Sequence, residues 1–280
     1  MRGYQSLVRQ AAPQKCKNYF NPLDVGRIYF SEKGEKVYGL IVESVIRTGV
    51  LRELGEIAEK LGITVRYLQY SMPKAREDVT KGIAFLDFTN SKIQPEDALE
   101  LLKTESFVKY AKLIKPVING IVSDNYFFPL VISGERVVIF RQSVYEALFD
   151  GIKKEFGSAG EAMLYYQGFN VGLKIYDTYA KIASSEDVEK LSEVARAINM
   201  TLGWGIIEVE DINVKKGTAD IIVYHNFECA NVKKSGKPNS HFVRGAAAGI
   251  FTRFIGKVAK AEEICCLAKG DPYCKFRVKT

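Results

Sequence analysis

The succession of apolar patterns over residues 37–114 constrains the fold of this chain more than any other feature. Short apolar runs rich in β-branched residues alternate there with segments whose apolar residues recur at helical spacing. The resulting order is strand, helix, strand, strand, helix, strand. This order is typical of a split βαβ, ferredoxin-like unit, in which helices cover one face of an antiparallel sheet. We therefore predict an α+β domain over residues 36–116, preceded by an arm over residues 1–35.

Turn residues bound the elements of this domain. Thr48 is placed to cap the first helix, Gly62 to end it, and Pro95 is tolerated in the first turn of the second helix. The expected strands cover residues 37–43, 63–70, 82–88 and 107–114, and the expected helices cover residues 50–61 and 95–102.

The turn Ile46-Arg47-Thr48-Gly49-Val50-Leu51 resembles that of the ACT family of small regulatory domains. The resemblance implies an amino-acid ligand at this turn, where backbone N–H groups at a helix N-terminus favour a carboxylate. Ile46 and Arg47 replace the acidic residue that usually precedes the turn. The residues present therefore favour a plain dimerisation or packing domain over an amino-acid sensor.

Residues 117–280 predict a second α+β domain, in which long helices pack on an antiparallel sheet. Ser143 is placed to cap its first helix. Gly168 and Gly172 stand four apart within a helix and allow another backbone to approach closely. The expected helices cover residues 144–156, 163–182, 186–199 and 241–255, and the expected strands cover residues 127–132, 136–140, 205–211, 219–227, 260–268 and 273–278.

Composition places the chain among ordinary globular proteins. Its 280 residues are 47% hydrophobic and 26% charged, and no apolar run approaches the roughly 20 residues that span a bilayer. The first 20 residues lack the apolar stretch of a secretion signal, so we expect a cytoplasmic location and no membrane partner. The net charge of +7 arises from Lys and Arg interspersed with Glu, a spread that does not predict nucleic-acid binding.

The most specific pattern is Glu-Glu-Ile-Cys-Cys-Leu-Ala-Lys-Gly-Asp-Pro-Tyr-Cys-Lys-Phe, which begins at Glu262 and ends at Phe276. Its Lys-Gly-Asp-Pro sequence predicts a hairpin turn that places Cys266 and Cys274 opposite each other. Two thiolates with a nearby carboxylate, that of Glu263, suit a tetrahedral Zn²⁺ site. Glu263 and Cys266 have opposite strand parity, so a bulge or a terminal twist is needed to bring the carboxylate round.

The residues leave the fourth ligand and the role of the thiols open. His241 opens the last helix, whereas Cys229 ends the preceding strand, and either side chain could complete the site. Alternatively, the hairpin cysteines are small buried apolar residues without a metal. A disulfide between Cys266 and Cys274 is a third option, restricted to oxidising or hyperthermophilic conditions.

From about residue 119 to residue 280 the chain resembles the 4-vinyl reductase type domain of archaeal proteins and phenol-sensing bacterial activators. The resemblance rests on the cysteine pattern above, on Asn226-Phe227-Glu228, and on the spacing of Gly245 and Gly249. In the phenol-sensing relatives the pattern holds a structural zinc beside an aromatic-ligand pocket. The resemblance thus implies zinc and a ligand pocket in this chain as well.

Carried over by position, the resemblance assigns Glu263, Cys266 and Cys274 as zinc ligands. The further cysteine of the relatives falls at about Ser240, next to His241. The fourth ligand is therefore expected to be His241, with Cys229 or a metal-free site as the alternatives.

A set of aromatic residues in the second half could line the ligand pocket or belong to the core. The candidate ligand-binding residues are Tyr165, Tyr166, Phe169, Trp204, Phe242 and Phe251. No catalytic residue is assigned, because neither a Ser/His/Asp arrangement nor a nucleotide fingerprint emerges from the spacing.

These observations predict a non-enzymatic sensor or regulatory protein that binds a small hydrophobic or aromatic molecule. It would form a homodimer, act on a regulatory protein partner, and contain zinc held by Glu263, Cys266, Cys274 and His241. One alternative, suggested by the name of the resembled family, is a thiol- or metal-dependent redox enzyme. Another is a dimeric scaffold without ligand, since the domain type also resembles trafficking-complex subunits that pair through helices.

Overall fold

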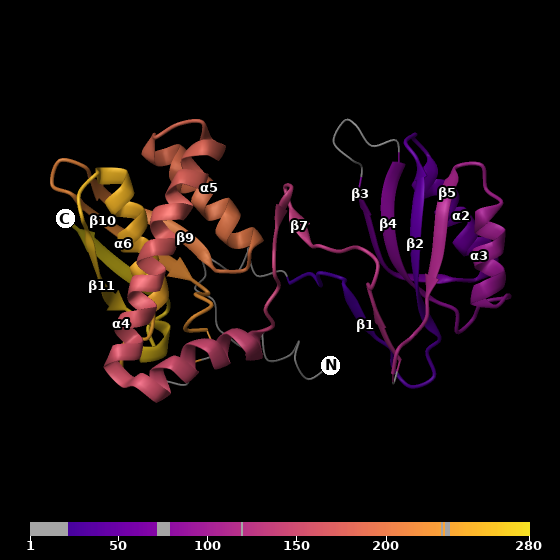
Figure 1. The fold of residues 1–280 in the computed structure, drawn as a ribbon, viewed down its shortest axis with the longest axis horizontal. Coiled ribbons are helices and arrows are strands. Elements are labelled where there is room, and N and C mark those ends of the chain that lie inside the picture. Colours follow the sequence, from indigo (N-terminus) through magenta and orange to yellow (C-terminus); the bar gives the residue numbers. More distant parts are fainter. Residues whose placement is uncertain (1–21, 72–78, 119, 231, 233–235) are drawn as a thin grey trace. The chain divides into compact units, whose positions relative to one another are not determined.

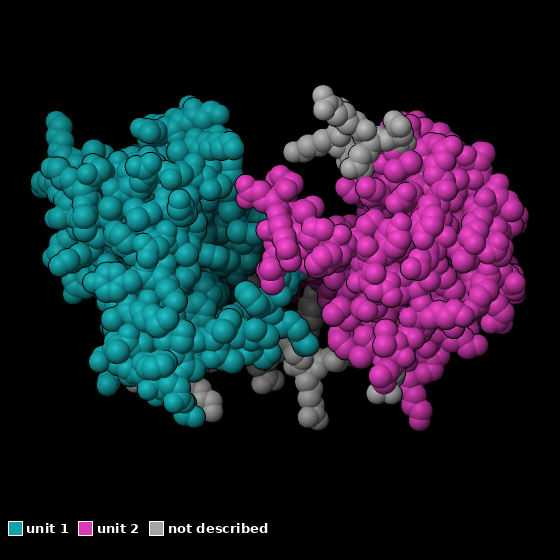
Figure 2. Space-filling model, in the orientation of Figure 1, with its two compact units in different colours: residues 1–21, 139–280 teal, residues 22–138 magenta. Residues whose placement is uncertain are grey.

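The computed structural model describes residues 22–71, 79–118, 120–230, 232 and 236–280. These residues form two compact units, which Figure 2 colours separately and which are considered one at a time. The units divide after Val138, whereas the sequence suggested a boundary after residue 116. Most of the predicted arm, including Cys16, lies outside the described residues.

The first unit is built on a four-stranded antiparallel sheet (Figure 1). Its strands, in spatial order, are β3 (Thr64–Ser71), β4 (Val79–Asp87), β2 (Val37–Val45) and β5 (Val108–Ile114). Its helices are α2 (Val50–Leu61) and α3 (Pro95–Lys103). This order and these directions confirm the predicted split βαβ arrangement.

Both faces of this sheet are covered. Successive residues of a strand point to opposite faces, so Ala84 and Leu86 of β4 pack with the helices while Phe85 packs on the other side. The second face is covered by the antiparallel pair β1 (Ile28–Phe30) and β6 (Ile121–Ser123). Because β6 buries its side chains here, the unit extends beyond residue 116.

The helix α2 begins and ends at glycines. Gly49 is its N-cap residue with φ 92°, so the prediction that Thr48 caps the helix is wrong. Gly62 ends it with φ 70°, as predicted. Arg47 donates two hydrogen bonds of 2.7 Å to the carboxylate of Glu53 beside this turn.

The first unit ends in a short hairpin. The strands β7 (Val131–Ile132) and β8 (Glu135–Arg136) have two residues each, much shorter than predicted. Ser133 and Gly134 form its turn with φ of 52° and 87°. A two-residue connection with positive φ at both positions suits the strand twist of a hairpin.

The second unit packs long helices on another antiparallel sheet, as predicted (Figure 1). The strands, in spatial order, are β11 (Lys260–Cys265), β12 (Cys274–Lys279), β10 (Thr218–Tyr224) and β9 (Ile206–Asn213). The helices are α4 (Gln142–Ala183), α5 (Val188–Thr201) and α6 (His241–Ile255).

The helix α4 is broken into two stretches. Gly157 has φ 54° and ψ −131°, which is not helical, and the break separates the two helices that the sequence predicted there. The N-cap residue is Arg141, so the prediction that Ser143 caps the helix is wrong. Across the described parts of the chain, α4 included, the structure has no helix with the length and apolar character to cross a membrane.

Glycines bring α4 and α6 into backbone contact. A Cβ atom added to Gly168 would lie 2.0 Å from the carbonyl oxygen of Phe242, and one added to Gly245 would lie 2.0 Å from that of Tyr165. Gly172 and Gly249 repeat the pattern one turn further along. The close approach predicted from the glycine spacing is confirmed. It fixes the position of α6, whose first turn borders the candidate site.

Candidate metal centre and adjoining pocket

Three cysteines and one glutamate gather at the first turn of α6. The Sγ atoms of Cys229, Cys266 and Cys274 and a carboxylate oxygen of Glu263 all lie within 4.8 Å of one another. All three cysteines are buried, and Glu263 is half-buried. Four donors of these types at such separations are a candidate metal centre.

The hairpin of β11 and β12 positions three of the donors. The register of the two strands shifts between Glu263 and Cys265, so β11 contains the irregularity that the sequence required. Cys266 follows the strand at the start of a 3₁₀ turn, η2 (Leu267–Lys269), and its backbone N–H donates to Asp271 at 2.7 Å. Cys274 is the first residue of β12.

The turn after β10 supplies the fourth donor. The side-chain amide of Asn226 donates to the Oγ of Ser240 at 2.9 Å, and its Oδ1 accepts from the backbone N–H of Glu228 at 3.1 Å. The N–H of Cys229 donates to the carbonyl oxygen of Asn226 at 3.0 Å. Asn226 thereby folds the chain back and directs Cys229 to the other donors.

Ser240 orients the glutamate. Its hydroxyl donates to Oε1 of Glu263 at 2.6 Å, and its backbone N–H donates to Oε2 at 3.1 Å. The same Oγ lies 3.0 Å from Sγ of Cys229 and 3.4 Å from Sγ of Cys274. Both oxygens of the carboxylate are therefore held in place beside the thiols.

His241 lies elsewhere. Its Nε2 is 3.8 Å from a carboxylate oxygen of Glu161, and within the described chain it does not belong to the four-donor group. The structure thus assembles the other three predicted ligands and adds Cys229, which the sequence left as an alternative. Cys265 is half-buried and outside the group.

The geometry fits zinc. Two thiolates bound to one tetrahedral Zn²⁺ at about 2.3 Å lie about 3.8 Å apart. The Sγ atoms of Cys229 and Cys266 are 3.7 Å apart. Three sulfurs and one carboxylate oxygen are also ligand types that zinc accepts.

The protonation of the donors is strongly interdependent. A hydrogen bond from Cys229 lowers the pKa of Cys266, and the same bond raises the pKa of Cys229. For Cys274, the lowering effect of Cys229 is outweighed by the neighbouring Cys266 and by burial, and its pKa rises to about 12. Burial raises the pKa of Glu263 to about 8. Without a cation the group keeps most of its protons, so metal binding would release them.

The predicted ligand-binding residues fall into three groups. Trp204 and Phe242 belong to an aromatic cluster around Phe227, with ring centroids 5.5 Å and 6.3 Å from its ring. Tyr166 is 65% exposed. The remaining three pack in or against the core between α6 and the sheet, and they are Tyr165, Phe169 and Phe251. They do not share one cavity.

A cavity of about 110 Å³ adjoins the aromatic cluster. It is lined by Tyr145, Glu146, Phe149, Asp150, Phe227, Glu228 and Val232. Sequence reasoning missed Tyr145 and Phe149, although their spacing of four residues places them on one face of a helix.

Glu228 is the buried polar group of this cavity. Its carboxylate accepts hydrogen bonds from the backbone N–H groups of Phe242 at 3.0 Å and Val243 at 2.9 Å, at the N-terminus of α6. Burial raises its pKa to about 7. The partial positive charge of the helix end stabilises the ionised form and limits this rise.

Comparison with known proteins bears on this unit. Residues 219–280 match the family model of the vinyl-4-reductase domain, which confirms the 4-vinyl reductase type resemblance for this part of the chain. The matched segment contains all four donors of the candidate metal centre. An uncharacterized protein of Methanocaldococcus jannaschii is 28% identical over 137 residues, which are 49% of this chain and 74% of that protein.

Two solved structures are similar in part. The phenol-responsive sensory domain of the transcription activator PoxR is 18% identical with a TM-score of 0.44, covering 52% of this chain and 77% of that one. A vinyl-4-reductase family protein from Methanocaldococcus jannaschii is 18% identical with a TM-score of 0.36, covering 52% of this chain and 83% of that one.

Proposed function

We propose that the second unit is the small-molecule-binding module of a sensory or regulatory protein and that zinc stabilises it. One observation carries the proposal: consecutive residues serve both places. Phe227 and Glu228 line the cavity, and Cys229 joins the metal donors. A cation bound by Cys229 would therefore hold one wall of the cavity in its binding conformation.

The cavity suits one aromatic ring with a polar substituent. Phe149 and Phe227 form its aromatic wall, and rings prefer the edge-to-face contacts that such a wall offers. The carboxylate of Glu228 is buried and can accept a hydrogen bond from a hydroxyl group. A dry cavity of about 150 Å³ holds benzene in another protein, so this cavity of about 110 Å³ is of the right order.

The zinc would be structural. Four protein donors complete a tetrahedral coordination shell, whereas a catalytic zinc keeps one position open for water or substrate. The donors here are Cys229, Glu263, Cys266 and Cys274. This geometry favours ligand binding over the thiol- or metal-dependent enzyme that the sequence left as an alternative.

Calorimetric titration of the zinc-loaded full chain with phenol tests the proposal. We expect saturable binding by the wild type and loss of binding by Phe149→Trp, because the larger ring fills the cavity. Phe156→Ala is the control, since Phe156 lies on the same helix, is exposed and does not line the cavity. Absence of binding by the wild type, or equal binding by all three proteins, would refute it.

The proposal includes a homodimer formed through the outer face of α4. Met163 and Tyr166 are three residues apart on this helix, so they share a face, and both are exposed. Tyr166→Glu should therefore convert a dimer to a monomer in light-scattering measurements. A wild-type monomer at all concentrations would remove the dimer from the proposal, and with it the scaffold alternative.

A further inference from the structure

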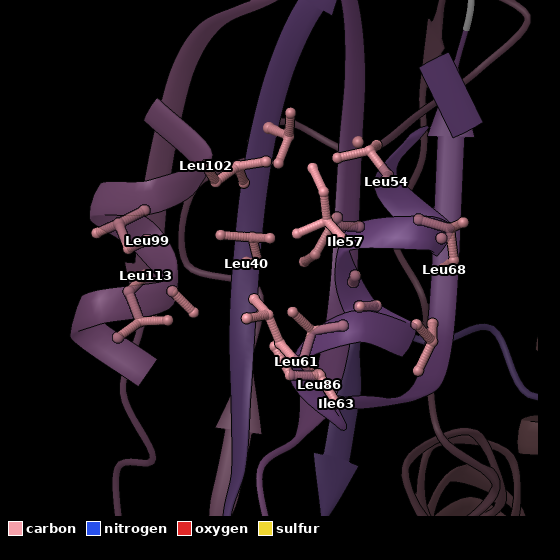
Figure 3. Close-up of a pocket in the computed structure, with 18 of the residues that line it drawn as sticks. Leu40, Leu54, Ile57, Leu61, Ile63, Leu68, Leu86, Leu99, Leu102 and Leu113 are labelled. Carbon is pink, nitrogen blue, oxygen red and sulfur yellow. The ribbon is translucent and has the colours of Figure 1, made fainter. Parts of the chain in front are cut away.

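The first unit contains an apolar cavity of its own, of about 130 Å³, between the sheet and the two helices. Figure 3 shows leucine and isoleucine side chains of α2, including Leu54 and Ile57, facing Leu40 of β2 and Leu86 of β4 across this space. Among the described residues that line it, none carries a charge. The cavity thus offers contacts to apolar groups only.

Small residues leave the space open. Ala58 of α2, Ala84 of β4 and Ala98 of α3 line the cavity within an otherwise leucine-rich layer. Gly55 stands in the middle of α2 with ordinary helical φ, and a Cβ added there would meet nothing within 4 Å. Glycine destabilises the middle of a helix relative to alanine. Neither backbone conformation nor close packing requires Gly55, and its effect is to leave room at the cavity.

One side of the cavity opens between α2 and the edge strand β3. Leu51, Val65 and Leu68 line it there, and they are 47%, 44% and 47% exposed. Large apolar side chains that rim a cavity provide an entry for an apolar molecule from solvent. Figure 3 shows Leu68 on β3, across the space from the leucines of α2.

The polar groups beside the cavity are already satisfied. The Tyr70 hydroxyl forms hydrogen bonds of 2.6 Å with Ser44 and 2.5 Å with Thr80, and the latter two are themselves 2.6 Å apart. A buried water needs two to four polar partners, so a cavity without open polar groups stays dry. Water is therefore a poor occupant.

We propose that this cavity binds a small uncharged apolar molecule of about the size of a single benzene ring. A dry cavity of about 150 Å³ with a lining of Leu, Ile and Phe is known to take up benzene. An amino acid would find no charged partner here. The cavity is also far too small for a helix of a protein partner, which is about 10 Å across.

Benzene titration of the full chain with labelled leucine and isoleucine methyl groups tests this site by NMR. We expect saturable shifts at the methyl groups of Leu54, Ile57 and Leu68. Gly55→Leu and Ala84→Leu should abolish these shifts, because the added side chains occupy the cavity. The observed methyl groups belong to the first unit, so binding in the second unit leaves them unchanged.

Two further variants make the outcome decisive. Glu59→Leu adds the same side chain to an exposed position of α2 outside the cavity, and it should retain the shifts. Gly55→Ala is the conservative variant if Gly55→Leu fails to fold, and it should weaken benzene binding while keeping the fold. The proposal is overturned if wild-type shifts do not saturate or if they persist unchanged in the filled variants. It is also overturned if a second copy already covers these methyl groups in the absence of benzene.

Discussion

Ser240 stands where the resembled domains carry a cysteine, and it changes how the metal donors are arranged. A serine hydroxyl is a weaker zinc ligand than a thiolate, but its two hydrogen bonds orient Glu263. The missing thiol is supplied by Cys229, from the turn after β10. The donor count is preserved although the positions differ.

Replacing Ser240 by alanine should weaken metal binding about 10- to 100-fold, because groups that orient a metal ligand typically contribute this much. The backbone N–H would still donate to Glu263, so binding should be weakened rather than lost. Competition with a chromophoric zinc chelator measures the affinity. An unchanged affinity would mean that Ser240 does not orient the ligand.

Asp220 provides a pH-dependent contribution to the second unit. Its buried carboxylate accepts hydrogen bonds of 2.9 Å from Arg277 and lies 3.0 Å from Nζ of Lys275. The hydrogen bonds from Arg277 hold the pKa of Asp220 below its usual value. A carboxyl group whose pKa is lowered by folding stabilises the protein above its unfolded-state pKa and stops doing so as the pH falls.

Asp220→Asn should therefore lower the free energy of unfolding by about 1–3 kcal/mol at about pH 7. The difference from wild type should shrink at about pH 3, where the wild-type carboxyl group also gains a proton. Urea unfolding at both pH values measures it. Asp177→Asn is the control, because its ion pair with Arg253 is exposed and should contribute little. An equal difference at both pH values would contradict this assignment.

Several residue positions could be predicted from sequence, and others could not. The strand parity of Glu263 required an irregularity in β11, and the register shift confirms it. The choice of Cys229 over His241 depended on how the Asn226 side chain folds the turn after β10, which spacing alone does not determine. Thr48 was chosen as a cap by its side chain, but Gly49 with positive φ begins the helix.

At the scale of elements, the contact between α4 and α6 positions the metal centre. Glycines on both helices bring the backbones together, so the first turn of α6 is placed against the hairpin of β11 and β12. The helix predicted for residues 241–255 coincides with α6, because Gly256 with φ 72° ends it. The hairpin predicted over residues 127–140 is far shorter, since apolar content alone does not pair strands.

Gly168→Ala should destabilise the second unit by about 1–3 kcal/mol, because its Cβ would lie 2.0 Å from a backbone oxygen of α6. Gly151→Ala is the matched control on the same helix. A Cβ at Gly151 meets nothing within 4 Å, so this change should stabilise the helix by about 0.5–1 kcal/mol. Thermal unfolding measures both, and effects of the same sign would contradict the packing described here.

At the scale of the whole molecule, the chain combines two α+β units with separate cores. The fold class and the order of elements followed from hydrophobic periodicity, because each sheet and helix face repeats over many residues. The extent of the first unit did not, since β1 and β6 are three-residue strands that pair across about 90 residues of chain. Such short, distant pairs leave too weak a pattern in the sequence.

Removing metal should affect the two units unequally. A chelator would take away the cation that links the turn after β10, the first turn of α6 and the β11–β12 hairpin. Hydrogen–deuterium exchange should then increase in these segments and remain unchanged in the sheet of the first unit. Equal loss of protection in both units would show that the metal does not act locally.

The zinc content of the purified full chain and three variants, measured by elemental analysis and native mass spectrometry, tests the central claim most directly. We predict one zinc ion per chain in the wild type, in Cys265→Ser and in His241→Ala, and none in Cys229→Ser. Zinc retained by Cys229→Ser, or a metal-free wild type with reduced thiols after growth with zinc, would contradict the four-donor site.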